Sequence, residues 1–195
     1  MEISEIVYLT GYCIATVIRS YYGMQFKRKE IAASRHDSPV VYTGIAIWAV
    51  VLILPFFSIF TDWLVFADYE ILPSLKSLGA IIFFFSLLVL FRSHLDLARN
   101  FSPGLFIRNK HTLVTTGIYR YIRHPMSLSF MLWAIGQALL IDNWLSGPLG
   151  LLAFALIYLF RVEREEQQLV ERFGAEYELY QNKTGRVLPM MIKKK

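Results

Sequence analysis

Long apolar stretches recur along this chain, and they constrain its fold more than any other feature. Residues 40–60 contain no charged side chain. A helix needs roughly 20 apolar residues to cross a bilayer, so this stretch is long enough to do so alone. The other apolar blocks comprise residues 3–18, 78–91, 126–141 and 147–160. The sequence therefore predicts an all-α, polytopic membrane protein with about five transmembrane helices.

Composition and loop charges support a membrane location and suggest an orientation. The chain is 55% hydrophobic and only 18% charged, whereas soluble domains carry about a quarter charged residues. Basic residues cluster after the first, third and fifth blocks, and acidic residues lie between the second and third. The positive-inside rule then predicts an amino terminus outside and a carboxyl terminus in the cytoplasm.

The excess of positive charge does not call for a nucleic-acid partner. The formal net charge is +5, and basic loops facing anionic membrane lipids account for it. The single cysteine, Cys13, cannot form an intrachain disulfide, and the four histidines have no cysteine partners. The sequence therefore predicts contact with membrane lipids, no nucleic-acid binding and no metal site.

Two long polar segments, residues 92–125 and 161–195, are expected on the same cytoplasmic face. Pro125 suits the first position of a helix, where its missing N–H costs nothing. His124 would then lie at the helix amino terminus, which favours a carboxylate ligand. Alternatively, Arg120, Arg123 and His124 anchor the protein to lipid phosphates.

The second polar segment begins at the end of the last apolar block. Arg161 and Glu165 are four residues apart and share a helix face, although Glu165 and Glu166 are also compatible with a solvated face. Apolar residues then recur with helical spacing and predict a cytoplasmic amphipathic helix. These residues are Leu169, Val170, Phe173, Tyr177 and Tyr180.

An ordered set of motifs in residues 92–190 resembles the isoprenylcysteine carboxyl methyltransferase family. The motifs are H-T-L-V, G-I-Y, R-H-P, R-V-E-R-E-E and F-G-A-E-Y, followed by a final Pro. More broadly, the segment is similar to membrane methyltransferases that include phospholipid N-methyltransferases. The apolar blocks predict transmembrane helices in residues 1–91, and the turn-forming residues 142–147 predict a helical hairpin at 126–160. The resemblance implies that residues 92–195 form the cofactor-binding half.

The resemblance also implies a cofactor, S-adenosyl-L-methionine, and a set of site residues. Arg161 and Glu165 would be catalytic, and Arg161 would bind the substrate carboxylate. The cofactor-binding positions would be His111, Thr112, Leu113, Val114, Tyr119, His124, Pro125, Met126, Ser127, Glu165 and Glu166. The chain departs from the family at Ser127 and Ser129, where a Tyr and a Gly are usual.

The expected function is methylation of a lipophilic or prenylated acceptor that enters from the bilayer. The reaction that we expect before the others is carboxyl O-methylation of an isoprenylcysteine-type substrate. A carboxylate is ionised at pH 7 and needs no general base, and Arg161 can orient it. An amine acceptor, as in phospholipid N-methylation, would instead lose a proton to Glu165, Glu166 or water. Another possibility is a relative of the NADPH-dependent sterol reductases, although the chain is short for their number of helices. A further possibility is a non-enzymatic membrane scaffold.

Overall fold

The structure is a computed structural model that describes residues 1–24, 31–33, 39–97, 107–108 and 112–190. The chain is helical, as the sequence predicts, and two short strands, β1 (Ile31–Ala33) and β2 (Ile107–Arg108), pair antiparallel. The α-helices are α1 (Ile3–Met24), α2 (Pro39–Phe60), α3 (Pro73–Leu97), α4 (Pro125–Leu140), α5 (Pro148–Phe173) and α6 (Ala175–Gln181). Two 3-10 helices, η2 (Asp62–Ala67) and η4 (Gly117–Arg120), complete the described elements.

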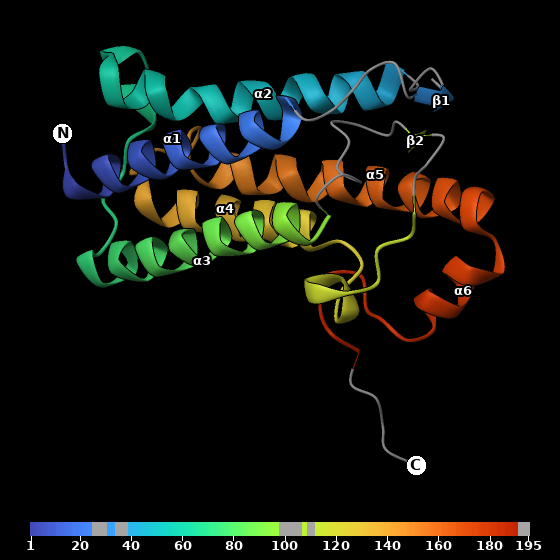
Figure 1. Cartoon of the computed structure of the whole chain (residues 1–195). Helices are drawn as coiled ribbons and strands as arrows, with labels where there is room; N and C mark the ends of the chain where they lie inside the picture. Colours follow the sequence, from blue (N-terminus) through green and yellow to red (C-terminus); the bar gives the residue numbers. More distant parts are fainter. Residues whose placement is uncertain (25–30, 34–38, 98–106, 109–111, 191–195) are drawn as a thin grey trace.

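The five long helices lie lengthwise beside one another in a bundle (Figure 1). The 3-10 helix η4, the start of α4, the second half of α5 and α6 gather toward one end of this bundle. We call this the site end. Residues from widely separated parts of the sequence therefore come together there.

An aromatic cluster forms the centre of the bundle. The ring centroids of Tyr8 and Phe83 lie 5.6 Å apart, and those of Phe83 and Trp133 lie 4.6 Å apart. The helices α3 and α4 approach closely because Gly136 has no side chain: a Cβ there would lie 2.9 Å from the Phe83 Cβ. Small residues permit such close helix contacts in apolar surroundings. This packing fixes where α4 begins relative to α3.

The connection between α4 and α5 occupies residues 141–147, where the sequence predicts a turn. Asn143 organises it. The Asn143 side-chain amide donates to the Leu64 carbonyl and to Asp68 Oδ1, both at 2.7 Å. Its Oδ1 accepts from the backbone N–H groups of Leu145 and Ser146, both at 3.1 Å. The turn and η2 are thereby held together at the end of the bundle away from the site end.

The helix α5 is longer than the sequence suggested. The predicted span of 147–160 ends where charges begin, yet the helix continues to Phe173, because Arg, Glu and Gln are good helix formers. Gly174, with φ of +53°, separates α5 from α6. The predicted amphipathic helix from Leu169 to Tyr180 is therefore divided between two helices, which corrects the expectation of a single one.

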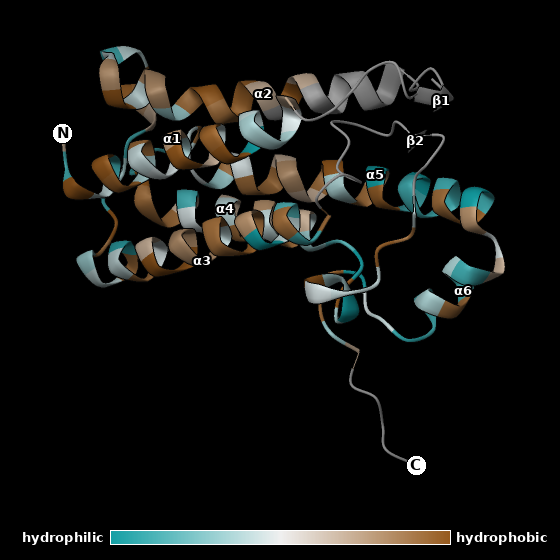
Figure 2. Cartoon of the chain, in the orientation of Figure 1, coloured by the Kyte–Doolittle hydropathy of each residue, from teal (hydrophilic) through white to brown (hydrophobic). Residues whose placement is uncertain are grey.

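Within the described part of the chain, α3 is the one helix long and apolar enough to cross a membrane. Only 22% of its 18-residue apolar window is buried inside the protein. Two shorter apolar helical stretches are Ala49–Phe60 and Pro125–Leu140. Figure 2 shows hydrophobic residues along the bundle and hydrophilic ones on the second half of α5 and on α6. Much of the apolar surface of α3 thus remains uncovered by protein.

Candidate functional site

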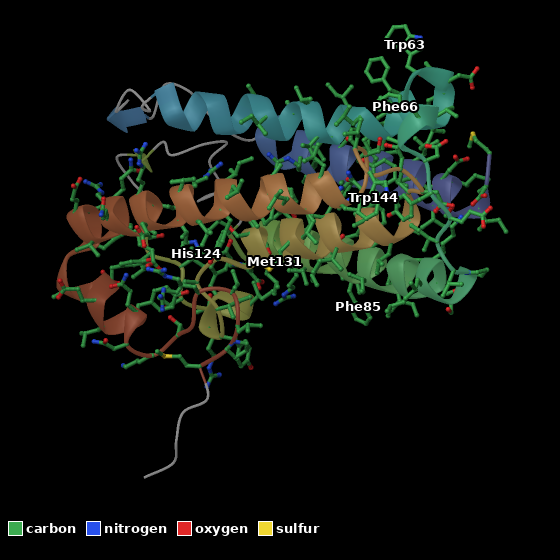
Figure 3. The ribbon with its side chains drawn as sticks, turned by 180° about the vertical axis from the view of Figure 1, so that it is seen from behind. Trp63, Phe66, Phe85, His124, Met131 and Trp144 are labelled. Carbon is green, nitrogen blue, oxygen red and sulfur yellow. The ribbon has the colours of Figure 1, made fainter. Side chains whose placement is uncertain are left out.

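His124 and Pro125 begin α4, as the sequence predicts. Pro125 occupies the start of the helix and His124 is the N-cap residue. The His124 side chain makes no cap hydrogen bond, and its Nε2 lies 3.2 Å from Glu166 Oε1. Figure 3 shows His124 beside α5, far from Trp63 and Phe66 at the opposite end of the bundle. The histidine ring therefore connects the start of α4 to α5.

Glu166 is the centre of a buried polar cluster. The residue is only 5% exposed. Its Oε1 accepts a hydrogen bond of 2.9 Å from Arg123 Nε, and its Oε2 lies 3.0 Å from Arg186 Nε and 2.9 Å from Arg186 Nη2. We call Arg123, His124, Glu166 and Arg186 the Glu166 cluster. It joins the start of α4, the middle of α5 and the segment after α6.

The charges around Glu166 keep its carboxylate ionised. Burial alone would raise the pKa of Glu166, but hydrogen bonds from His124 and Arg123, together with their charges, lower this pKa to about 2. Two arginines face this single carboxylate, so the cluster carries surplus positive charge even when His124 is neutral. An arrangement of this kind favours an anionic ligand at its surface.

The segment after α6 crosses the start of α4 and holds it in place. The backbone N–H groups of Arg123 and His124 donate to the carbonyls of Gly185 and Arg186, both at 2.8 Å. The Arg123 guanidinium also donates to the Gln181 carbonyl at 3.0 Å and to the Thr184 carbonyl. Sequence reasoning did not include Arg123 or Arg186 among the site residues. The R-H-P motif was a signal for Arg123, whereas nothing local distinguishes Arg186.

The 3-10 helix η4 depends on a glycine and on the end of α3. Gly117 has φ of +61°, and a Cβ at this position would collide with the Asp96 carboxylate. Asp96 Oδ2 accepts a 2.7 Å hydrogen bond from the Ile118 N–H. Arg92, one turn earlier on α3, holds the same carboxylate at 2.9–3.0 Å. The G-x-Y motif is thus fixed to α3 through Asp96.

Tyr119, predicted as a cofactor-binding residue, is buried. Its backbone carbonyl accepts a 2.5 Å hydrogen bond from the Tyr180 hydroxyl. Burial, reinforced by the charge of Glu165, raises the pKa of the Tyr119 hydroxyl. Burial likewise raises the pKa of Tyr180, to about 12. Both phenols are therefore neutral at physiological pH, and the Tyr180 hydroxyl serves as a hydrogen-bond donor.

Glu165 has very different surroundings from its neighbour Glu166. Arg161 Nε lies 3.8 Å from Glu165 Oε2, and the two side chains are 38% and 34% exposed. This is a loose pair on one helix face, as the spacing of four residues predicts. Glu165 and Arg161 are therefore accessible to a ligand, whereas the Glu166 carboxylate is already occupied by protein donors.

The remaining predicted site residues that the structure describes lie near the site end of the bundle. Thr112 is exposed, Leu113 and Val114 are half-buried, and Pro125 is buried. Met126 and Ser127, in the first turn of α4, are half-buried, and Ser129 is buried. His111 lies outside the described residues.

Comparison with known proteins identifies the relatives of this region. A sequence model of the isoprenylcysteine carboxyl methyltransferase (ICMT) family matches residues 78–171. A protein-S-isoprenylcysteine O-methyltransferase of Schizosaccharomyces pombe is 41% identical over 85 residues, which cover 43% of this chain and 36% of the relative. The Homo sapiens protein of the same name is 31% identical over 140 residues, covering 67% of this chain and 49% of the relative.

A solved structure has the same fold. It is the eukaryotic intramembrane Ras methyltransferase ICMT, which superposes with a TM-score of 0.59 at 21% identity. The match covers 93% of this chain and 63% of the solved chain. The chain spans about a third to a half of the length of the two curated relatives. Residues 78–171 thus match the isoprenylcysteine carboxyl methyltransferase family model, and the chain has the fold of the solved ICMT structure.

Proposed function

We propose that this protein is an integral-membrane methyltransferase that uses S-adenosyl-L-methionine to methylate the carboxylate of a lipophilic, isoprenylcysteine-type acceptor. The observation that carries the proposal is the Glu166 cluster. It lies at the start of α4 and in the middle of α5, both within the residues that match the family. The curated relatives carry the name of this activity.

The uncovered apolar surface supports a membrane location. A soluble protein would bury the apolar face of a helix such as α3, yet only 22% of its 18-residue apolar window is buried. In this proposal lipid covers it, and the amino terminus lies outside. The Glu166 cluster then faces the cytoplasm, where a soluble cofactor is available, and about five helices cross the bilayer.

The residues at the site end fit the amino-acid part of S-adenosylmethionine. The surplus positive charge of the Glu166 cluster suits a carboxylate, and the accessible Glu165 carboxylate suits an ammonium group. When bound, this cofactor supplies an activated methyl group on a sulfonium. Glu166 contributes to this cofactor site by organising the cluster. Further cofactor-binding positions in this proposal are Thr112, Leu113, Val114, Tyr119, His124, Pro125, Met126 and Ser127.

Arg161 is the proposed acceptor-binding residue, and with Glu165 it forms the catalytic pair. A carboxylate acceptor is already ionised at pH 7, so the protein has no proton to remove. Its main work is to orient the acceptor oxygen, and a guanidinium can hold a carboxylate through two parallel hydrogen bonds. Arg161 is free to do so because its contact with Glu165 is long and partly exposed.

The test is methyl transfer by the purified protein in lipid nanodiscs. Labelled S-adenosylmethionine is supplied with N-acetyl-S-farnesylcysteine, its methyl ester or phosphatidylethanolamine. We expect label only with the free acid, in a product whose label is released by mild base, as a methyl ester requires. Label in phosphatidylethanolamine alone would replace the proposal with N-methylation. No transfer to any acceptor, by protein that binds the cofactor, would overturn the proposed acceptor class.

A further inference from the structure

A second exposed cation lies near the proposed acceptor-binding residue. Arg19, near the end of α1, places its guanidinium carbon 5.2 Å from the centroid of the Phe130 ring on α4. Arg19 is accessible to solvent, although neighbouring protein desolvates part of its guanidinium. In the described part of the chain, no carboxylate forms an ion pair with it. The ring fixes the guanidinium by a cation–π contact while leaving its hydrogen-bond donors available.

A second cation lies near Arg19. The guanidinium of Arg161 on α5 is close enough for electrostatic repulsion with Arg19. The acidic partner of Arg161 is Glu165, at 3.8 Å. Two guanidinium groups thus share the neighbourhood of one loosely held carboxylate. Such an arrangement is costly at the edge of a membrane unless an anion binds there.

These two arginines lie deeper in the bundle than the Glu166 cluster. Arg161 precedes Glu166 on α5 by five residues, and Phe130 follows Pro125 on α4 by five. At 1.5 Å per residue, each step moves about 7.5 Å away from the start of α4. An anion bound by Arg19 and Arg161 would therefore lie between the polar site end and the apolar helices.

We propose that Arg19 is an acceptor-binding residue, which with Arg161 selects lipophilic molecules that carry a carboxylate at one end. The inference rests on the proposed function, since it assigns the acceptor to this part of the site. The position fits such a molecule: the carboxylate meets the two guanidinium groups and the apolar tail continues toward the bilayer. Arg19 contributes acceptor selection, and the Glu166 cluster contributes the cofactor site.

Equilibrium binding separates acceptor selection from methyl transfer. The probes are N-acetyl-S-farnesylcysteine and its methyl ester, which differ in the carboxylate charge. Binding is measured with protein in phosphatidylcholine nanodiscs, which contain no net-anionic lipid. We expect the wild type to prefer the acid, and Arg19→Gln to lose about tenfold in affinity for the acid, as expected for a charged hydrogen bond. Affinity for the ester should stay unchanged.

Two further variants and one further ligand test the specific role of the cation. Arg19→Lys should retain part of the preference for the acid, and Phe130→Leu should weaken it by releasing the guanidinium. Arg120→Gln removes an exposed arginine elsewhere at the site end and should leave the preference intact. S-adenosylhomocysteine should bind Arg19→Gln as it binds the wild type, because Arg19 lies away from the Glu166 cluster.

The possible outcomes distinguish this inference from the proposed function. An acid preference that is intact in Arg19→Gln would overturn the inference and leave Arg19 as a lipid-phosphate anchor. An equal loss of acid, ester and S-adenosylhomocysteine binding would overturn it as well, since the role would then be structural. If the acid preference depends on Arg19 but no methyl transfer occurs, the inference stands and the proposed reaction fails.

Discussion

Glu165 and Glu166 are adjacent in sequence and have different surroundings. Glu166 is buried and bound by three basic side chains, whereas Glu165 is a third exposed and pairs loosely with Arg161. The family resemblance assigns cofactor contact to Glu165, with Glu166 as its neighbour. The geometry suggests a division in which Glu166 organises the site and Glu165 remains available to a ligand.

Substituting each glutamate separately should distinguish these roles. Glu166→Gln leaves the largely buried Arg123 without its carboxylate, so we expect a loss of about 3 kcal/mol in stability and weaker binding of S-adenosylhomocysteine. Glu165→Gln should weaken binding with little change in stability, because exposed pairs contribute at most about 1 kcal/mol. Thermal unfolding and calorimetric titration measure the two effects. Equal melting temperatures for the two variants would contradict the assignment.

The stabilising effect of Glu166 should depend on pH. Its pKa is lowered from 4.5 to about 2 in the folded protein. Ionised Glu166 therefore stabilises the fold above pH 4.5, and this contribution is lost as the pH falls toward 2. We expect the difference in melting temperature between wild type and Glu166→Gln to be largest near neutral pH and to narrow in acid. A difference that stays constant across this range would exclude the linkage.

At the scale of the elements, η4 is fixed by one backbone conformation and one carboxylate. Gly117 provides the positive φ, and Asp96 accepts from the Ile118 N–H beside it. The turn carries Tyr119 into the interior and leads directly to Arg123. A disturbance at Gly117 should therefore reach the Glu166 cluster.

Gly117→Ala tests this connection, and Gly174→Ala is its matched control. Both glycines have positive φ, but a Cβ at Gly174 meets no atom within 4 Å. The backbone strain of either substitution is about 1–3 kcal/mol, and only Gly117→Ala also displaces Asp96. We expect both variants to melt earlier and only Gly117→Ala to lose affinity for S-adenosylhomocysteine. Normal affinity in Gly117→Ala would show that η4 does not position the site.

Local rules predicted part of these elements from sequence. The uncharged run of residues 40–60 coincides closely with α2, and Pro125 begins α4. The predicted end of the last apolar helix, at residue 160, was wrong. Hydropathy locates the end of an apolar run, whereas charged residues continue a helix readily. The role of Arg186 could not be predicted without the structure, because its contact with Glu166 joins segments 20 residues apart across the break at Gly174.

At the scale of the whole molecule, the two ends of the bundle differ in character. The site end carries the Glu166 cluster. The opposite end carries η2, with Trp63 and Phe66 73% and 81% exposed, and a bridge from Lys76 to Glu2 at 2.5 Å and to Asp142 at 2.6 Å. Exposed aromatic residues of this kind are enriched at membrane interfaces. The proposed orientation places this end outside.

Cysteine accessibility tests the orientation. In a Cys13→Ser background, single cysteines replace Glu70, between α2 and α3, or Lys183, after α6; both positions are exposed. We expect a membrane-impermeant maleimide to label Glu70→Cys on intact cells and to label Lys183→Cys only after permeabilisation. The reverse pattern would invert the topology, and labelling of both on intact cells would show that these positions share one side.

The most direct test of the proposed methyltransferase site is equilibrium binding of S-adenosylhomocysteine to the purified protein in nanodiscs, with NADPH as the comparison ligand. We expect saturable binding of S-adenosylhomocysteine that weakens in Glu165→Gln, and no binding of NADPH. Binding of NADPH alone would instead indicate a relative of the sterol reductases. Binding of neither ligand, by protein with a cooperative thermal transition, would contradict the assignment of a methyltransferase site.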